Sequence, residues 1–126
     1  GSEGSTFGGY PLASVASIYA IKVMIDENLA ECARTRGAQL MNHFDDIKAE
    51  FPDKIKENRG RGLLTAFEMH NSPRLDGQTV SVELLNRGVY AKETHHSTVR
   101  VAPALTIQAW QIDNIAEAVR DVVKSL

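Results

Sequence analysis

Segments with helical periodicity and short strand-like runs follow one another in an order that restricts how this chain can fold. A helix-rich stretch comes first, then strands, a short helix, more strand residues and a final helix, without internal repeats. This order is typical of the α+β class. We therefore expect a small antiparallel or mixed sheet with helices mainly on one face, preceded by a long connecting helix.

The N-terminal part of the chain is predicted to form two helices. Pro11 suits the first turn of a helix because its missing N–H costs nothing there, and residues 12–25 are apolar on most faces. Asn28 and Glu31 have the spacing of a capping box, which predicts a second helix that ends at Phe51-Pro52. Apolar residues recur in it at helical intervals, namely Leu29, Ala33, Leu40, Phe44 and Ile47.

Four strands and two further helices are expected after residue 52. The expected strands are 54–58, 63–69, 89–92 and 98–103, with the first pair bending at the glycines of "RGRG". The expected helices are 80–87, where Gly88 suits the left-handed position past a helix end, and 108–126. The last helix carries one apolar stripe that should cover a sheet face: Ile112, Ile115, Val119, Val122 and Leu126.

Size and charge exclude several classes of protein. The 126 residues are enough for one domain core, and the 14 basic residues are scattered among 16 acidic ones, so no nucleic-acid footprint is expected. The most apolar stretch, 11–25, contains Lys22 and hydroxyl residues and is too polar to span a membrane. The single cysteine, Cys32, excludes an internal disulfide, fits a reducing compartment and is expected to be a small buried residue of the second helix. A cytoplasmic protein is therefore expected.

The opening "GSEGSTFGGYP" is rich in glycine and hydroxyl residues and leads into a predicted helix. Backbone N–H groups and the positive end of a helix dipole attract anions, so phosphate binding is one interpretation. A P-loop is excluded because Tyr10-Pro11 stands where lysine and a hydroxyl residue are required. A dinucleotide fingerprint also fails, since no strand precedes the glycines. From spacing alone, a flexible leader is an equal alternative.

Four motifs in register resemble the C-terminal portion of class III aminotransferases, which depend on pyridoxal phosphate: "GSTFGGYPLA", "RGRGLL", "AKETH" and "VRVAPAL". The resemblance covers essentially the whole chain. It implies the small C-terminal domain of a fold-type I pyridoxal-phosphate enzyme. We therefore expect residues 1–27 to form a phosphate-contacting loop and connecting helix, and residues 28–126 to form the α+β domain.

The resemblance also implies site residues. Thr6, helped by Ser5, is expected to donate to the phosphate of the pyridoxal phosphate bound in the other subunit of a homodimer. Arg100 is expected to bind the substrate carboxylate, because a planar guanidinium can form two parallel hydrogen bonds to it. The chain departs from the family pattern at Glu3, Tyr10 and His96. A carboxylate near a phosphate is repulsive, so Glu3 must point away or be paired.

The implied reaction moves an amino group, expected to be the δ-amino group of ornithine, to a 2-oxo acid. The family's catalytic lysine lies upstream of the "GST" segment, so no catalytic residue is assigned here and the fragment alone is expected to be inactive. The mitochondrial matrix is the expected location if the source is eukaryotic. The alternative to an aminotransferase fragment is a free-standing, non-catalytic α+β binding or interaction module.

Other reactive residues receive simpler interpretations. Lys22 lies in an apolar helix without a phosphate cradle nearby, so we expect it to extend its charge to solvent. Neighbouring His95 and His96 would point to opposite faces of a strand, and with His70 they make no ligand set, so no metal is expected.

Overall fold

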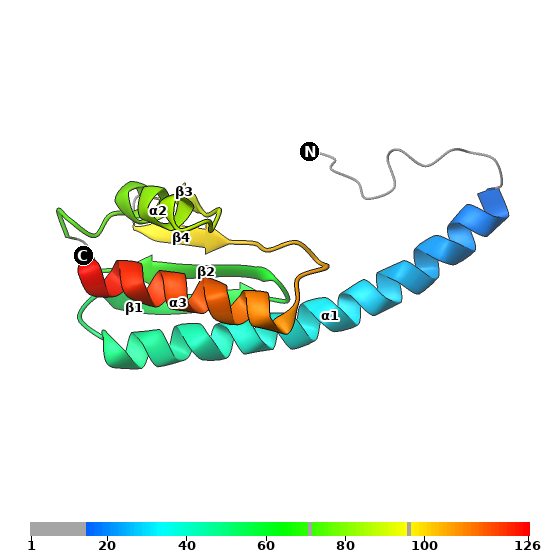
Figure 1. The fold of residues 1–126 in the computed structure, drawn as a ribbon, viewed down its shortest axis with the longest axis horizontal. Helices are drawn as coiled ribbons and strands as arrows, with labels where there is room; N and C mark the ends of the chain where they lie inside the picture. Colours follow the sequence, from blue (N-terminus) through cyan, green and yellow to red (C-terminus); the bar gives the residue numbers. More distant parts are fainter. Residues whose placement is uncertain (1–14, 71, 96) are drawn as a thin grey trace.

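The computed structural model describes residues 15–70, 72–95 and 97–126, with side chains described from residue 28 onward. Three helices and four strands occupy these residues (Figure 1). In chain order they are α1 (Val15–Glu50), β1 (Ile55–Arg61), β2 (Leu64–Met69), α2 (Gly77–Asn86), β3 (Lys92–Thr94), β4 (Thr98–Val101) and α3 (Ala109–Ser125). The expected α+β class is confirmed.

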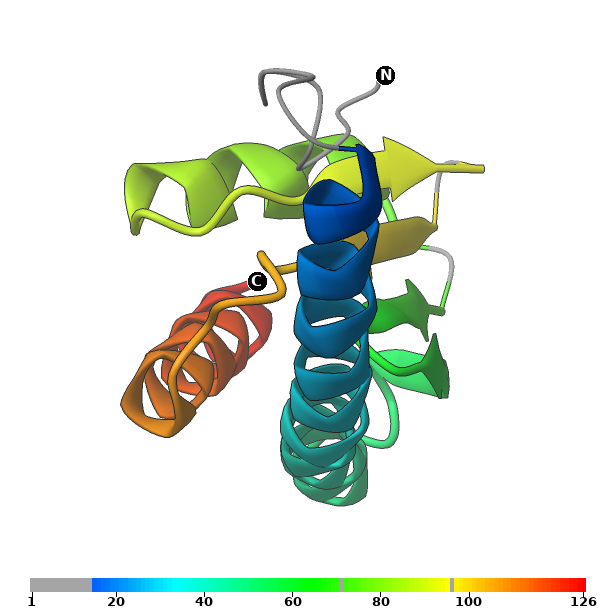
Figure 2. The ribbon, with the colours of Figure 1, turned by 90° about the vertical axis from the view of Figure 1, so that its right-hand side faces the viewer.

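The four strands form one sheet in the order β1-β2-β4-β3. Each neighbouring pair is antiparallel, which decides between the antiparallel and mixed sheets expected from the sequence. Seen from the end at which α1 begins, the three helices lie on one side of the sheet (Figure 2). One face of the sheet is therefore covered by helices, and the described part of the chain places no helix on the other.

α1 is a single helix of 36 residues, so the predicted break at Asn28 is wrong. No proline or glycine stands between Pro11 and Gly37 to interrupt the helical hydrogen bonds. Glu31 does not cap a helix start but pairs with Arg34 one turn along the surface. Asn28 and Glu31 could cap a helix start only if the backbone before them were non-helical, but α1 runs through both residues. The first turns of α1 extend beyond the sheet (Figure 1).

The bend predicted across "RGRG" occurs only at its C-terminal end. β1 continues through Arg61, and the two-residue connection is Gly62 and Leu63, with Gly62 at φ 58°. A glycine at a left-handed position suits such a tight hairpin. The hairpin lies directly over α1, where a Cβ on Gly37 would stand 2.0 Å from the carbonyl oxygen of Gly62.

Two other element boundaries differ from the predicted ones. α2 begins at Gly77 because Asp76 caps it, accepting a 2.8 Å hydrogen bond from the Thr79 backbone N–H. β3 is Lys92–Thr94, whereas 89–92 was predicted. Val89 and Ala91 are buried, so their apolar pattern indicated packing and not strand pairing. Gly88 has φ 83°, as expected past a helix end.

The core lies between the sheet and the helices. The Phe44 ring on α1 meets the Phe67 ring on β2 edge-on, with centroids 5.4 Å apart. α3 contributes four fully or nearly fully buried aliphatic residues, Ile112, Val119, Val122 and Val123. The predicted stripe on α3 is confirmed at its centre, while Ile115 and Leu126 are only partly buried.

Candidate functional site

Arg100 lies on β4, an inner strand of the sheet, with β2 on one side and β3 on the other. Its neighbours Val99 and Val101 are buried beneath the helices, while Arg100 is exposed. Because side chains alternate across a strand, Arg100 projects from the helix-free face of the sheet. The ladders on both sides fix its backbone, so a rigid element presents the guanidinium.

The register places specific residues beside Arg100 on the same face. Ala66 of β2 is directly opposite on one side, and Lys92 of β3 is directly opposite on the other. Ala66 in turn faces Arg59 of β1. The open face therefore carries a row of three cationic side chains, interrupted by the small Ala66.

Arg59 is the row member whose charge is balanced within the sheet. Its guanidinium pairs with Glu57 and, at 3.1 Å, with Glu68. Hydrogen bonding from Arg59 lowers the pKa of the Glu68 carboxyl below its ordinary value, with Lys56 adding a smaller attraction. Arg59 and Glu68 thus favour each other's charged forms. Among the described residues, no carboxylate makes an ion pair with Arg100.

The chemistry available at Arg100 is recognition of an anion. A guanidinium without an internal partner can accept a carboxylate in a bidentate geometry. Ala66 leaves room on one side of it, since its side chain is a single methyl group. The position is consistent with the carboxylate-binding role expected for Arg100.

Ser5 and Thr6, the expected phosphate donors, lie outside the described residues, so the structure does not test whether they approach Arg100. Three surface cavities lined by the described residues contain no lysine that could bond the cofactor pyridoxal phosphate.

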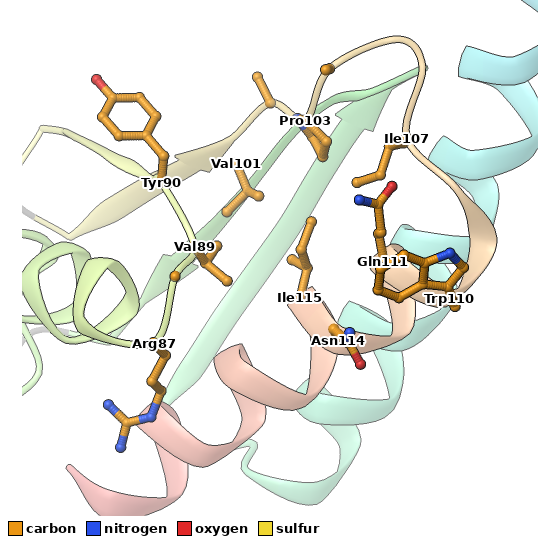
Figure 3. A pocket seen from close by; sticks show the side chains of 13 residues that line it. Arg87, Val89, Tyr90, Val101, Pro103, Ile107, Trp110, Gln111, Asn114 and Ile115 are labelled. Carbon is orange, nitrogen blue, oxygen red and sulfur yellow. The ribbon is translucent and has the colours of Figure 1, made fainter.

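The cavity of about 480 Å³ between the α2–β3 connection and α3 was not anticipated from the sequence (Figure 3). Val101, Ile107 and Ile115 line it from β4, from the connection before α3 and from α3 itself. Trp110 lies at its border with 62% of its surface exposed. This cavity lies on the helix side of the sheet, opposite the face that carries Arg100.

Two further findings concern the described residues only. No three histidine, cysteine, aspartate or glutamate side chains among them gather closely enough to hold a metal ion. Within the same residues, no helix combines the length and the apolar character needed to cross a membrane. Cys32, expected to be buried, is exposed on α1.

Comparison with known proteins places the chain in a family. The aminotransferase class-III family matches residues 1–123. The mitochondrial ornithine aminotransferase of Arabidopsis thaliana is 39% identical over 98% of this chain, and the chain covers 26% of that protein. The chain spans only about a quarter to a third of the length of such relatives.

Solved structures resemble this chain in fold as well as in sequence. The acetylornithine aminotransferase of Elizabethkingia anophelis matches all of this chain with a TM-score of 0.76 and 30% identity, and 31% of that protein is covered. The ornithine delta-aminotransferase of Plasmodium falciparum matches 99% of the chain with a TM-score of 0.70 and 34% identity, and 32% of it is covered. The chain belongs to the class III aminotransferase family.

Proposed function

We propose that this chain is the C-terminal part of an ornithine δ-aminotransferase. The longer enzyme converts ornithine and a 2-oxo acid to glutamate semialdehyde and an amino acid. The proposal is supported by ornithine aminotransferases that are 36% to 43% identical over nearly all of this chain. The observation that carries it is Arg100, a guanidinium on a rigid inner strand that has no ion-pair partner among the described residues.

Arg100 binds and orients a substrate carboxylate in this proposal. Its two parallel hydrogen bonds fix the direction of the carboxylate, which limits the poses of the rest of the substrate.

Ser5 and Thr6 donate hydrogen bonds to the phosphate of pyridoxal phosphate across a homodimer interface. The cofactor, when bound, acts as the electron sink for amino transfer. The catalytic lysine belongs to the preceding part of the enzyme, so the fragment alone is inactive. The cytoplasm is the proposed location, or the mitochondrial matrix in a eukaryote.

The role of Arg100 is tested in the full-length enzyme by Arg100→Ala. A hydrogen bond to a charged group contributes about 1.5–3 kcal/mol, so kcat/KM should fall by about 10- to 150-fold. The matched control is Arg74→Ala, which removes an exposed arginine outside the sheet. Unchanged kcat/KM in the Arg100 variant, with the enzyme correctly folded, rejects the carboxylate-binding role.

The substrate and the cofactor contacts are tested separately. The full-length enzyme should use ornithine with a higher kcat/KM than N-acetylornithine or lysine, and a preference for either of these would overturn the substrate assignment.

Thr6→Ala should release pyridoxal phosphate faster during dialysis, as followed by the absorbance of the bound cofactor. Equal retention by the variant and the parent enzyme would remove Thr6 from the phosphate site.

A further inference from the structure

Lys92 and Arg100 form an unusual pair of like charges on the open face of the sheet. They are directly opposite each other on the antiparallel strands β3 and β4, and both are exposed. Residues paired in this way project from the same face with Cβ atoms about 5 Å apart, and like charges there destabilise a sheet. The pairing therefore calls for a compensating anion.

The neighbouring carboxylates do not supply that anion. Glu57 and Glu68 bind Arg59 near the opposite edge of the sheet, and Lys56 also lies 3.7 Å from Glu68. Glu93 follows Lys92 in β3 and is paired with Val99, a residue of the helix-covered face. Among the described residues, neither Lys92 nor Arg100 makes an ion pair with a carboxylate.

We propose that Lys92 is a second carboxylate-binding residue, which shares the substrate carboxylate with Arg100. This inference rests on the proposed role of Arg100. A carboxylate has about four lone-pair sites, so a bidentate guanidinium leaves acceptors free for an ammonium group. The flexible lysine stem lets its head group converge on an anion held by the more rigid guanidinium. A shared carboxylate also neutralises the repulsion between the two strands.

The competing explanation is that Lys92 only protects an edge strand. β3 is the outer strand of the sheet, and lysine on such strands discourages pairing with other chains. That role requires a charge but no ligand. The two explanations differ in what happens to carboxylate affinity when the charge is removed.

The experiment uses the full-length holoenzyme with Lys92→Gln, Lys92→Arg and the control Lys56→Gln. Lys56 lies on β1, the opposite edge strand, so its variant removes the same charge from the same sheet at a distance from Arg100. The readouts are KM and kcat for the amino donor and the 2-oxo acid, and the dissociation constant of glutarate as a carboxylate probe. Each is measured at low and high salt.

Lys92→Gln should raise the glutarate dissociation constant and the KM of at least one substrate about 3- to 10-fold, with kcat changing less than twofold. Lys92→Arg should restore most of the affinity, and Lys56→Gln should leave it unchanged. Equal effects of the Lys92 and Lys56 variants would overturn the inference, because only the overall field would then matter. If Arg100→Ala weakens glutarate binding and Lys92→Gln does not, Lys92 is rejected while the proposed function stands. If neither variant weakens it, both proposals fail.

Discussion

At the scale of single residues, the contact between α1 and the β1–β2 hairpin depends on two glycines. Gly37 is buried on α1, and the space where its Cβ would stand is occupied by the Gly62 carbonyl. Gly62 itself has a left-handed backbone that glycine adopts without strain. A helix interior normally disfavours glycine by about 1 kcal/mol relative to alanine. The close approach of the two backbones explains why glycine is nevertheless required here.

Gly37→Ala should therefore destabilise the fold although alanine is the better helix former. The new Cβ would stand 2.0 Å from a backbone oxygen, so the hairpin must move. Overpacking of this kind costs about 1–3 kcal/mol, and we expect the unfolding free energy in urea to fall within that range. The control Ala38→Gly changes helix propensity at an exposed neighbouring position and should cost about 1 kcal/mol. A Gly37→Ala variant as stable as the parent would contradict the close approach.

At the scale of elements, the start of α2 is fixed by its cap. Asp76 accepts hydrogen bonds from both the backbone N–H and the hydroxyl of Thr79, at 2.8 and 3.0 Å. Asp76→Ala removes both, and the unfolding free energy should fall by about 1 kcal/mol. Asp76→Asn keeps a capping oxygen and should cost clearly less. Equal losses in the two variants would show that the charge of Asp76, and not its capping bond, stabilises α2.

The packing of α1 against α3 includes an ion pair that should respond to pH. Arg120 donates two hydrogen bonds to the Glu50 carboxylate, at 2.7 and 2.5 Å. These bonds lower the pKa of Glu50 from its ordinary value of 4.5. The folded state therefore favours the ionised carboxyl. This stabilisation is fully present above the ordinary pKa of the unfolded chain, and it is lost as the pH falls through the lowered pKa of the folded state.

Urea unfolding of the parent and Glu50→Gln at several pH values measures this effect. The stability difference between them should be largest near neutral pH and shrink below about pH 4, and it should be small throughout because the pair is solvent-accessible. Added salt should reduce it at neutral pH. A difference that grows on acidification would have the wrong sign for a lowered pKa.

The elements also show which features the sequence determines. Apolar periodicity predicted most of the helices and strands, because each of them buries one face, but it divided α1 into two helices and placed the third strand before Lys92. It did not set the ends of β1 and β3, since Arg59 and Arg61 pair in the ladder although they are polar, and Val89 is buried without pairing. The candidate site likewise has one part that the sequence predicts and one part that it does not. Arg100 could be assigned by resemblance, but the proximity of Lys92 depends on strand register, which spacing along the chain does not contain.

At the scale of the whole molecule, the chain covers only about a quarter to a third of its aminotransferase relatives, and the proposed function assigns the catalytic lysine to a preceding part of the enzyme. We predict that residues 1–126 alone, mixed with pyridoxal phosphate, ornithine and 2-oxoglutarate, show no transamination. Borohydride reduction of the full-length protein should fix the cofactor to a lysine that precedes Gly1. Turnover by the isolated chain at a rate above that of free pyridoxal phosphate would contradict the fragment assignment and require a catalytic lysine within it.

The domain boundary proposed at residue 28 gives the last prediction. The core cluster of the described residues begins at Leu40 and ends at Val123, so residues 28–126 contain all of its members. A chain of about 100 residues buries enough surface to fold alone. Residues 28–126 should therefore unfold cooperatively, with a Tm within about 5 °C of that of residues 1–126, a shift equivalent to roughly 1 kcal/mol. Circular dichroism on heating measures this.

A shorter chain, 51–126, provides the control, because it removes Leu40, Phe44 and Ile47 from the core and exposes the Phe67 ring that packs on Phe44. Losing three buried apolar side chains costs far more than a domain of this size can lose, so this chain should show no cooperative transition. A non-cooperative 28–126 chain would place the domain boundary earlier in α1. The connecting segment would then be part of the folding unit, and its first turns would stabilise the same core that positions Arg100.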